Sequence, residues 1–92
     1  MDFIYRTHAI ERLFERDISE DDVEACVVDA NIIEEYSDDK PYPSYLALGY
    51  EGGDITKPIH VVFAKNLDSV IIITAYRPDK TKWINKYQTR IK

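Results

Sequence analysis

The chain has 92 residues, of which 45% are hydrophobic and 32% charged, with one cysteine and a formal net charge of -5. That length allows a single domain over residues 1–92, and the composition is typical of a folded globular protein, which excludes a disordered chain. No stretch approaches the roughly 18 apolar residues of a membrane helix, and the opening "MDFIYRTH" lacks the pattern of a secretory signal, so we expect a cytoplasmic protein with no membrane partner.

The first element expected is a helix in the segment "THAIERLFER", residues 7–16. Thr7 suits its N-cap, because the hydroxyl oxygen can accept a hydrogen bond from a free amide of the first turn. Apolar side chains recur at helical spacing, and they predict a buried stripe of Ala9, Ile10, Leu13 and Phe14. We therefore expect this helix to pack through one face and to expose the other.

A second helix is expected after the acidic segment "DISEDD". Ser19 is its expected N-cap, and the carboxylates that follow favour the positive end of the helix dipole. The helix should stop near residues 29–31, and its predicted core face holds Val23, Cys26, Val27 and Ala30. We interpret Cys26 as a small buried hydrophobic residue, since a lone cysteine forms neither an internal disulfide nor a metal-ligand cluster.

Further along, the spacing of apolar residues changes from helical to strand-like. Four strands are predicted, at Ile32–Tyr36, Ser44–Tyr50, Ile59–Ala64 and Ser69–Tyr76. The segment "EGGD" is a turn signal, and "KNLD" predicts a short hairpin between the last two strands. The last strand is almost continuously apolar, so we expect it to be central in the sheet and covered on both faces.

The C-terminal segment is expected to be a helix. Pro78 suits its first turn, and its apolar stripe would consist of Trp83, Ile84, Tyr87 and Ile91. Trp83 and Tyr87 would either fasten this helix to the body of the protein or stack on bases. The predicted fold class is α+β, with two N-terminal helices packed on a four-stranded, mainly antiparallel sheet and a short C-terminal helix.

Charge is segregated along the chain. Residues 1–56 hold fifteen acidic and four basic side chains, a net charge of -11, whereas residues 57–92 hold two acidic and eight basic ones, a net charge of +6. The basic part is compatible with a polyanionic partner, because phosphate contacts use clustered lysine and arginine. The alternative is that the two parts neutralise each other within the fold.

Three polar side chains follow one stripe of the first predicted helix. His8, Arg12 and Arg16 are spaced four residues apart, so each step turns the stripe by only about 40°. Two guanidinium groups placed in this way can hold a phosphate, and a neutral imidazole can act as a general base. Alternatively, the arginines form surface ion pairs with Glu11 and Glu15.

A second group of candidates comes from the last two strands. His60 lies within the apolar run "IHVVF", where its ring must find a hydrogen-bond partner or open onto a cleft. Tyr76 ends the following strand and Arg77 comes next, a usual position for a site. A satisfied core histidine is the alternative for His60. The hairpin register is not fixed by the sequence, and a slip by one residue would reverse the face that His60 occupies.

The segments "THAIERLFERDIS", "HVVF" and "ITAYRPDKTKW" together resemble the domain of unknown function 4258 of bacteria and archaea, over residues 6–90. The first of them follows the family pattern H-A-x-x-R-x-x-x-R-x-I-S. The resemblance implies a relation to RelE/ParE-type and BrnT-like toxins, which are small ribonuclease-like α+β proteins of toxin–antitoxin pairs. It also implies functional positions at His8, Arg12, Arg16, His60 and Tyr76.

The function implied is a metal-independent endoribonuclease without a cofactor, in which the ribose 2′-hydroxyl attacks the adjacent phosphorus. His8 and His60 would transfer protons, and arginines would stabilise the phosphorane. RNA would contact Arg77, Lys80, Lys82 and Lys86. The expected partner is a cognate antitoxin with a zinc-finger or DNA-binding domain. The alternatives are a non-catalytic RNA- or protein-binding module on the same scaffold, or an interaction partner with no site.

Overall fold

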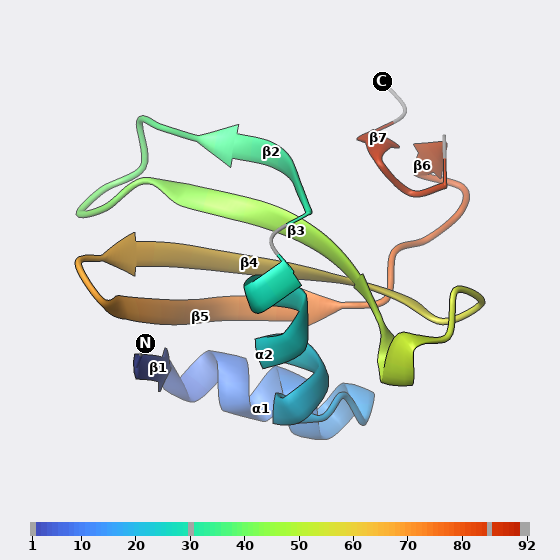
Figure 1. Cartoon of the computed structure of the whole chain (residues 1–92), viewed down its shortest axis with the longest axis horizontal. Coiled ribbons are helices and arrows are strands. Elements are labelled where there is room, and N and C mark those ends of the chain that lie inside the picture. The colour runs from blue at the N-terminus through green and yellow to red at the C-terminus, as the bar shows by residue number, and fades with distance from the viewer. Residues whose placement is uncertain (1, 30, 85, 91–92) are drawn as a thin grey trace.

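A computed structural model describes residues 2–29, 31–84 and 86–90. Two helices and a 3₁₀ turn, η1, accompany seven strands (Figure 1). In chain order the elements are β1 (Asp2–Tyr5), α1 (Thr7–Arg16), α2 (Glu20–Asp29), β2 (Ile32–Tyr36), β3 (Ser44–Tyr50), η1 (Glu51–Gly53), β4 (Pro58–Asn66), β5 (Ser69–Tyr76), β6 (Trp83–Ile84) and β7 (Thr89–Arg90). The predicted α+β class is confirmed, as are the positions of both N-terminal helices and of four strands.

The main sheet is mixed and has five strands in the order β1-β5-β4-β3-β2. Strands β2 to β5 form an antiparallel meander, whereas β1 pairs with β5 in parallel. The prediction of a four-stranded sheet was therefore incomplete, because β1 is short and only alternately half-buried. It lies at the sheet edge and pairs with Ser69–Ile72, so β5 is interior over that half, as predicted. The expected cover on both faces is incomplete, because Ile71 and Ile73 are only half-buried.

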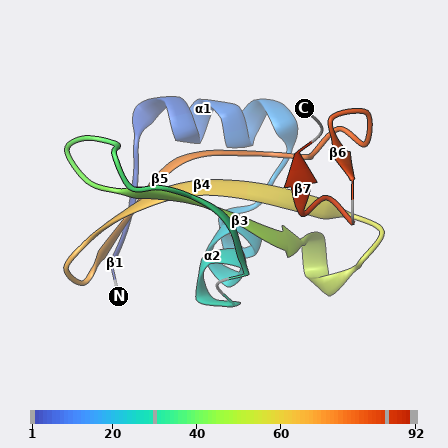
Figure 2. The same cartoon turned by 90° about the horizontal axis from the view of Figure 1, so that it is seen from above.

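Helix α1 lies along β5 and is less deeply buried than predicted (Figure 2). Ala9 and Leu13 are buried, whereas Ile10 is 55% and Phe14 89% exposed. The N-cap residue is Arg6, which makes no side-chain cap, so Thr7 is the first helical residue instead. At the other end Asp17 adopts the left-handed conformation and its amide donates to carbonyls of the last turn.

Helix α2 packs against β3 with the face that was predicted. Val23, Cys26 and Val27 are buried, while Ala30 lies outside the described residues. The predicted cap is also present, since Ser19 Oγ accepts from the Asp22 amide at 3.1 Å. Close packing requires a glycine opposite, because a Cβ atom on Gly49 would lie 2.7 Å from the Cys26 sulfur.

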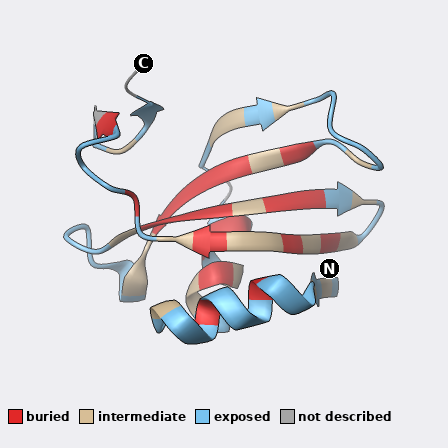
Figure 3. Ribbon diagram, turned by 180° about the vertical axis from the view of Figure 1, so that it is seen from behind, coloured by how far each residue is buried: buried red, intermediate tan, exposed pale blue. Residues whose placement is uncertain are grey.

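The two faces of the sheet are differently covered. Side chains from both helices share one core with residues such as Ala47, Val61 and Ala75, which lie side by side across β3, β4 and β5. Figure 3 shows buried residues running through these strands, while the outer side of α1 is exposed. The opposite face carries Leu48 and His60, and it is partly covered by the C-terminal segment.

The predicted C-terminal helix is wrong. The strands β6 and β7 instead pair antiparallel as a small hairpin, with Trp83 opposite Arg90 and Ile84 opposite Thr89. Lys86 and Tyr87 both have positive φ, of 56° and 67°, which a right-handed helix does not tolerate. The Ile84 side chain and Ile91 lie outside the described residues. Neither helix in the described part of the chain has the length and apolar character needed to cross a membrane.

Candidate functional site

The hairpin register, left open by the sequence, places His60 beside Tyr76 and Leu48, on the sheet face away from the helical core. His60 is fully buried, at 0% exposure, yet both of its ring nitrogens have partners. Nε2 lies 2.9 Å from the Tyr87 carbonyl oxygen and Nδ1 lies 3.3 Å from the Tyr76 hydroxyl. The C-terminal segment is therefore tied to the sheet through this ring.

These partners define the protonation state of His60. A carbonyl oxygen only accepts, so Nε2 carries the proton and donates to Tyr87. Burial lowers the pKa of His60, which outweighs the hydrogen bond to Tyr87 and the nearby Glu34 carboxylate. The ring is then neutral near pH 7, and its bare Nδ1 accepts from Tyr76. The pKa of Tyr76 is itself raised, chiefly by burial.

Trp83 contacts both the buried His60 ring and the partly exposed Arg90 side chain. Its ring contacts His60 edge-on, with centroids 4.4 Å apart, and is itself buried. The Arg90 guanidinium lies over the Trp83 ring, 4.6 Å from its centroid. The predicted fastening role of Trp83 is therefore confirmed, although it acts from a hairpin and not from a helix.

Arg90, Glu34 and Tyr36 lie together, and none of the three was predicted as a candidate site residue from the sequence. Arg90 Nη2 lies 3.4 Å from Glu34 Oε1, and the Tyr36 hydroxyl donates to the same carboxylate oxygen. Burial by itself would raise the pKa of Glu34, but the hydrogen bonds from Tyr36 and Arg90 outweigh it and the pKa is lowered. Burial and the hydrogen bond to Glu34 raise the pKa of Tyr36 to about 12.

Glu34 and Tyr36 share the sheet face of His60, because their partners on β3 are Leu46 and Ser44. The Glu34 side chain is 25% and that of Arg90 50% exposed, so a ligand can reach both. We refer to Glu34, Tyr36, His60, Tyr76, Trp83 and Arg90 as the sheet-face network. The alternation in "IIEEY" indicated that Glu34 and Tyr36 share a face, whereas Arg90, 56 residues away, gave no such signal.

The predicted stripe on α1 is divided in the structure. The ring of His8 is 86% exposed and lies 3.7 Å from Glu11, and Arg12 pairs with Glu15 at 3.0 Å. Arg12 thus makes a surface pair of the kind that was the alternative interpretation for the arginines, and His8 lies at the surface as well. Arg16 instead turns to the sheet, donating to the Ala75 carbonyl at 2.7 Å. None of the three contacts the sheet-face network among the described interactions, so their catalytic roles stay predictions.

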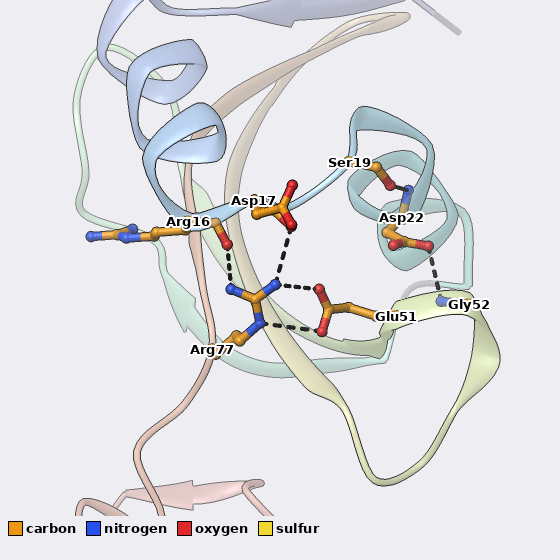
Figure 4. Close-up of polar contacts among 7 residues, drawn as sticks. All are labelled: Arg16, Asp17, Ser19, Asp22, Glu51, Gly52 and Arg77. Atoms are coloured by element: carbon orange, nitrogen blue, oxygen red, sulfur yellow. Dashed lines mark hydrogen bonds and ion pairs between the residues drawn. The ribbon is translucent and has the colours of Figure 1, made fainter.

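Arg77 is engaged within the protein (Figure 4). Its guanidinium binds both oxygens of Glu51, at 3.2 and 2.6 Å, and also donates to the backbone carbonyls of Arg16 and Asp17. It therefore joins the end of α1 to the turn after β3. A lysine could not reproduce this set of contacts, because its ammonium group lacks the planar fork.

The predicted RNA-binding lysines lie in the segment that follows β5. Lys80, Lys82 and Lys86 are exposed. Lys80 and Lys82 precede β6, and Lys86 lies between the two short strands. None of their side chains has a hydrogen bond or ion pair among the described interactions, and their contacts with RNA stay predictions.

The sheet-face network has the groups needed to bind a phosphate and move a proton. It provides an ionised carboxylate, a protonated phenol and a partly exposed guanidinium in direct contact. In the described part of the chain, no three His, Cys, Asp or Glu side chains are grouped as a metal site would require.

Of the comparisons with known proteins, the one with family models gives a match. No curated protein and no solved structure matches the chain. The family model described as "Domain of unknown function (DUF4258)" matches residues 5–77, which include α1, α2 and β2 to β5 but end before the C-terminal hairpin. Because the match covers most of the sequence, the chain belongs to the DUF4258 family.

Proposed function

We propose that this protein is a toxin-like, metal-independent endoribonuclease that cleaves RNA by attack of the 2′-hydroxyl on the adjacent phosphate. The single observation that supports this best is the contact of Glu34 with both Tyr36 and Arg90 on an accessible part of the sheet. A base, a proton donor and a cation are the three functions that the reaction requires.

In this proposal Glu34 is the general base. Its lowered pKa keeps the carboxylate ionised near neutral pH, so it can accept the proton of the attacking 2′-hydroxyl. The new P–O bond forms as this proton moves, and the bond from phosphorus to the 5′-oxygen of the next nucleotide breaks. The products are a 2′,3′-cyclic phosphate and a 5′-hydroxyl.

Tyr36 supplies the proton for the departing oxygen. With its pKa raised to about 12, the phenol stays protonated until a strongly basic alkoxide forms. After it donates, Glu34 carries the proton taken from the 2′-hydroxyl and Tyr36 lacks one. The existing Tyr36–Glu34 hydrogen bond returns the proton and restores both groups.

Arg90 stabilises the extra negative charge on the phosphorane. Its position depends on Trp83, and the position of Trp83 depends on the buried ring of His60. His60 and Tyr76 are thus positioning residues in this mechanism, in contrast to the sequence-based expectation that His60 transfers protons. His8 has no role in it, so His8→Asn should retain full activity.

The experiment compares two adjacent glutamates in EDTA-containing buffer with a fluorescently labelled RNA. Glu34→Gln should lower the cleavage rate by about 10²- to 10⁴-fold, the usual loss on removing a general base. Glu35→Gln is the matched control, since Glu35 faces the other side of the sheet and is exposed. An RNA with 2′-O-methyl groups should resist the wild type. Equal cleavage by the two glutamine variants would exclude Glu34 as the base.

The proposal includes a toxin–antitoxin pair and a fold related to the RelE/ParE and BrnT toxins. It is supported by the combined motifs at residues 7–19 and 73–83, which resemble the DUF4258 family, and by the relation to these toxins that the resemblance implies. Expression should arrest bacterial growth, and co-expression of an antitoxin encoded by an adjacent gene should relieve the arrest. Unimpaired growth of cells that contain soluble wild-type protein would contradict this part.

The alternative is a non-catalytic module that binds RNA or protein. It is favoured by one observation, that both nitrogens of His60 and the whole Arg77 guanidinium already have partners within the chain. Binding of intact RNA by the wild type, with a strong dependence on salt and no cleavage, would support this alternative over catalysis.

A further inference from the structure

A second feature adjoins the sheet-face network. It is an open depression of about 650 Å³, and its lining includes Asp17, Lys57, Pro58, Arg77, Pro78 and Tyr87. Its size suits a mononucleotide-sized ligand, since small-molecule sites typically measure about 300–1,000 Å³.

Three of the lining residues connect the depression to the network. The Tyr87 carbonyl accepts from His60 Nε2 at 2.9 Å, while the residue also lines the depression. Arg77 directly follows Tyr76, and Pro58 precedes His60 by two positions on β4. A nucleotide bound here would lie at the end of the network where Tyr87 contacts His60.

The walls offer flat, apolar surfaces. Pro78 is buried, and Pro58 and Tyr87 are half-buried. Proline and tyrosine rings can cover the faces of a planar base, as aromatic and apolar side chains do in single-stranded RNA sites. The side chains of Arg77 and Glu51 are held by each other and form a fixed part of the wall.

Two charged side chains of the lining, one acceptor and one donor, face no partner among the described interactions. Asp17 binds Arg77 through its backbone carbonyl, and its exposed carboxylate has no hydrogen bond among the described interactions. The Lys57 side chain is likewise exposed at the rim. A carboxylate can accept two parallel N–H bonds from one planar partner.

Among the four RNA bases, only guanine presents two adjacent N–H donors, at N1 and N2, next to a carbonyl acceptor, O6. We propose that this depression binds the guanine base of the RNA substrate, with the Asp17 carboxylate on N1 and N2 and the Lys57 ammonium on O6. The assignment rests on the proposed endoribonuclease function and adds a base preference to it.

The test is a titration of the full-length protein with GMP, AMP, CMP and UMP, followed by NMR amide shifts, which requires no cleavage. GMP should bind about 10- to 100-fold more tightly than the others, the discrimination of one bidentate base contact. Asp17→Asn should remove this preference. Asparagine tolerates the left-handed conformation of residue 17 (φ 54°), so the fold should persist.

Asp21→Asn is the control, because Asp21 is exposed on α2 and is not part of this lining. Equal affinity for the four nucleotides, or a GMP preference that survives in Asp17→Asn, would overturn the guanine assignment. GMP-selective binding without RNA cleavage would uphold the pocket and refute the proposed catalysis. RNA cleavage without base preference, together with equal binding of the four nucleotides, would support the proposed catalysis and refute the guanine pocket.

Discussion

The structure predicts that acidification destabilises the protein through His60. Its pKa in the folded state is lowered by burial, so between that value and the unfolded pKa of about 6.5 the unfolded chain binds the additional proton. The contribution of His60 to stability is therefore fully present above pH 6.5 and declines as the pH falls toward the folded pKa. In that window the loss approaches about 1.4 kcal/mol per pH unit, the limit for one proton.

Urea unfolding between pH 7.5 and 5 measures this loss, with Trp83 fluorescence as the probe. Trp83 is the only tryptophan and is 4% exposed against His60, so its emission reports the same part of the structure. The variant His60→Gln should be less stable than the wild type at pH 7.5, but its stability should depend much less on pH.

His8→Gln is the matched control, because the only other histidine is on the surface. It should retain the pH dependence of the wild type. If His60→Gln proves too unstable, the ring proton signals of the wild type give the His60 pKa directly by NMR. A His60 pKa at or above 6.5, or an unchanged pH dependence in His60→Gln, would refute the buried neutral ring.

Three further predictions concern stability and reactivity. Gly49→Ala should destabilise the fold by about 1–3 kcal/mol in denaturant unfolding, since the new Cβ would lie 2.7 Å from the Cys26 sulfur; an unchanged midpoint would mean that α2 shifts freely. Arg77→Lys should lower stability by about 1 kcal/mol, whereas Arg12→Lys, at an exposed pair, should change it by less than about 0.5 kcal/mol; equal effects would contradict the joining role of Arg77. The Cys26 thiol, with its pKa raised to about 12 by burial, should react with a thiol reagent only on unfolding, and rapid labelling of the native protein would count against its burial.

The sequence predicted the elements whose signal is local. The apolar spacing in α1 and α2 and the alternation in β2 and β3 each depend on a few neighbouring residues, and these elements were located correctly. Ser19 likewise caps its helix through a contact three residues away.

The errors arose where distant contacts decide the conformation. The spacing of Trp83 and Tyr87 fits a helix, but Tyr87 has φ 67° and its carbonyl bonds to His60, 27 residues away. Strand β1 has too few residues for periodicity to identify it, and it depends on pairing with β5. Phe14 fits an apolar stripe at helical spacing, yet it is 89% exposed, because spacing alone does not show how far the neighbouring sheet extends.

The candidate site could be predicted only in part, because it too depends on contacts between residues far apart in the sequence. His60 was a candidate because it is a polar residue within an apolar run, and Tyr76 because it ends a strand; the register, which the sequence left open, brings the two into contact. Glu34 and Arg90 are 56 residues apart in the sequence. Their charges alone do not show that these two side chains, among all the acidic and basic ones, form an ion pair. His8, Arg12 and Arg16 follow one stripe, but only Arg16 reaches the sheet.

The most direct test of the proposed mechanism is the chemical identity of the RNA ends that the protein generates. Wild-type protein and Glu35→Gln, incubated with RNA in EDTA, should give 2′,3′-cyclic phosphate and 5′-hydroxyl ends in mass spectra, and Glu34→Gln should give almost none. Intact RNA with the wild type, 5′-phosphate ends, or equal yields of cyclic phosphate from both glutamine variants would contradict attack by the 2′-hydroxyl with Glu34 as the base.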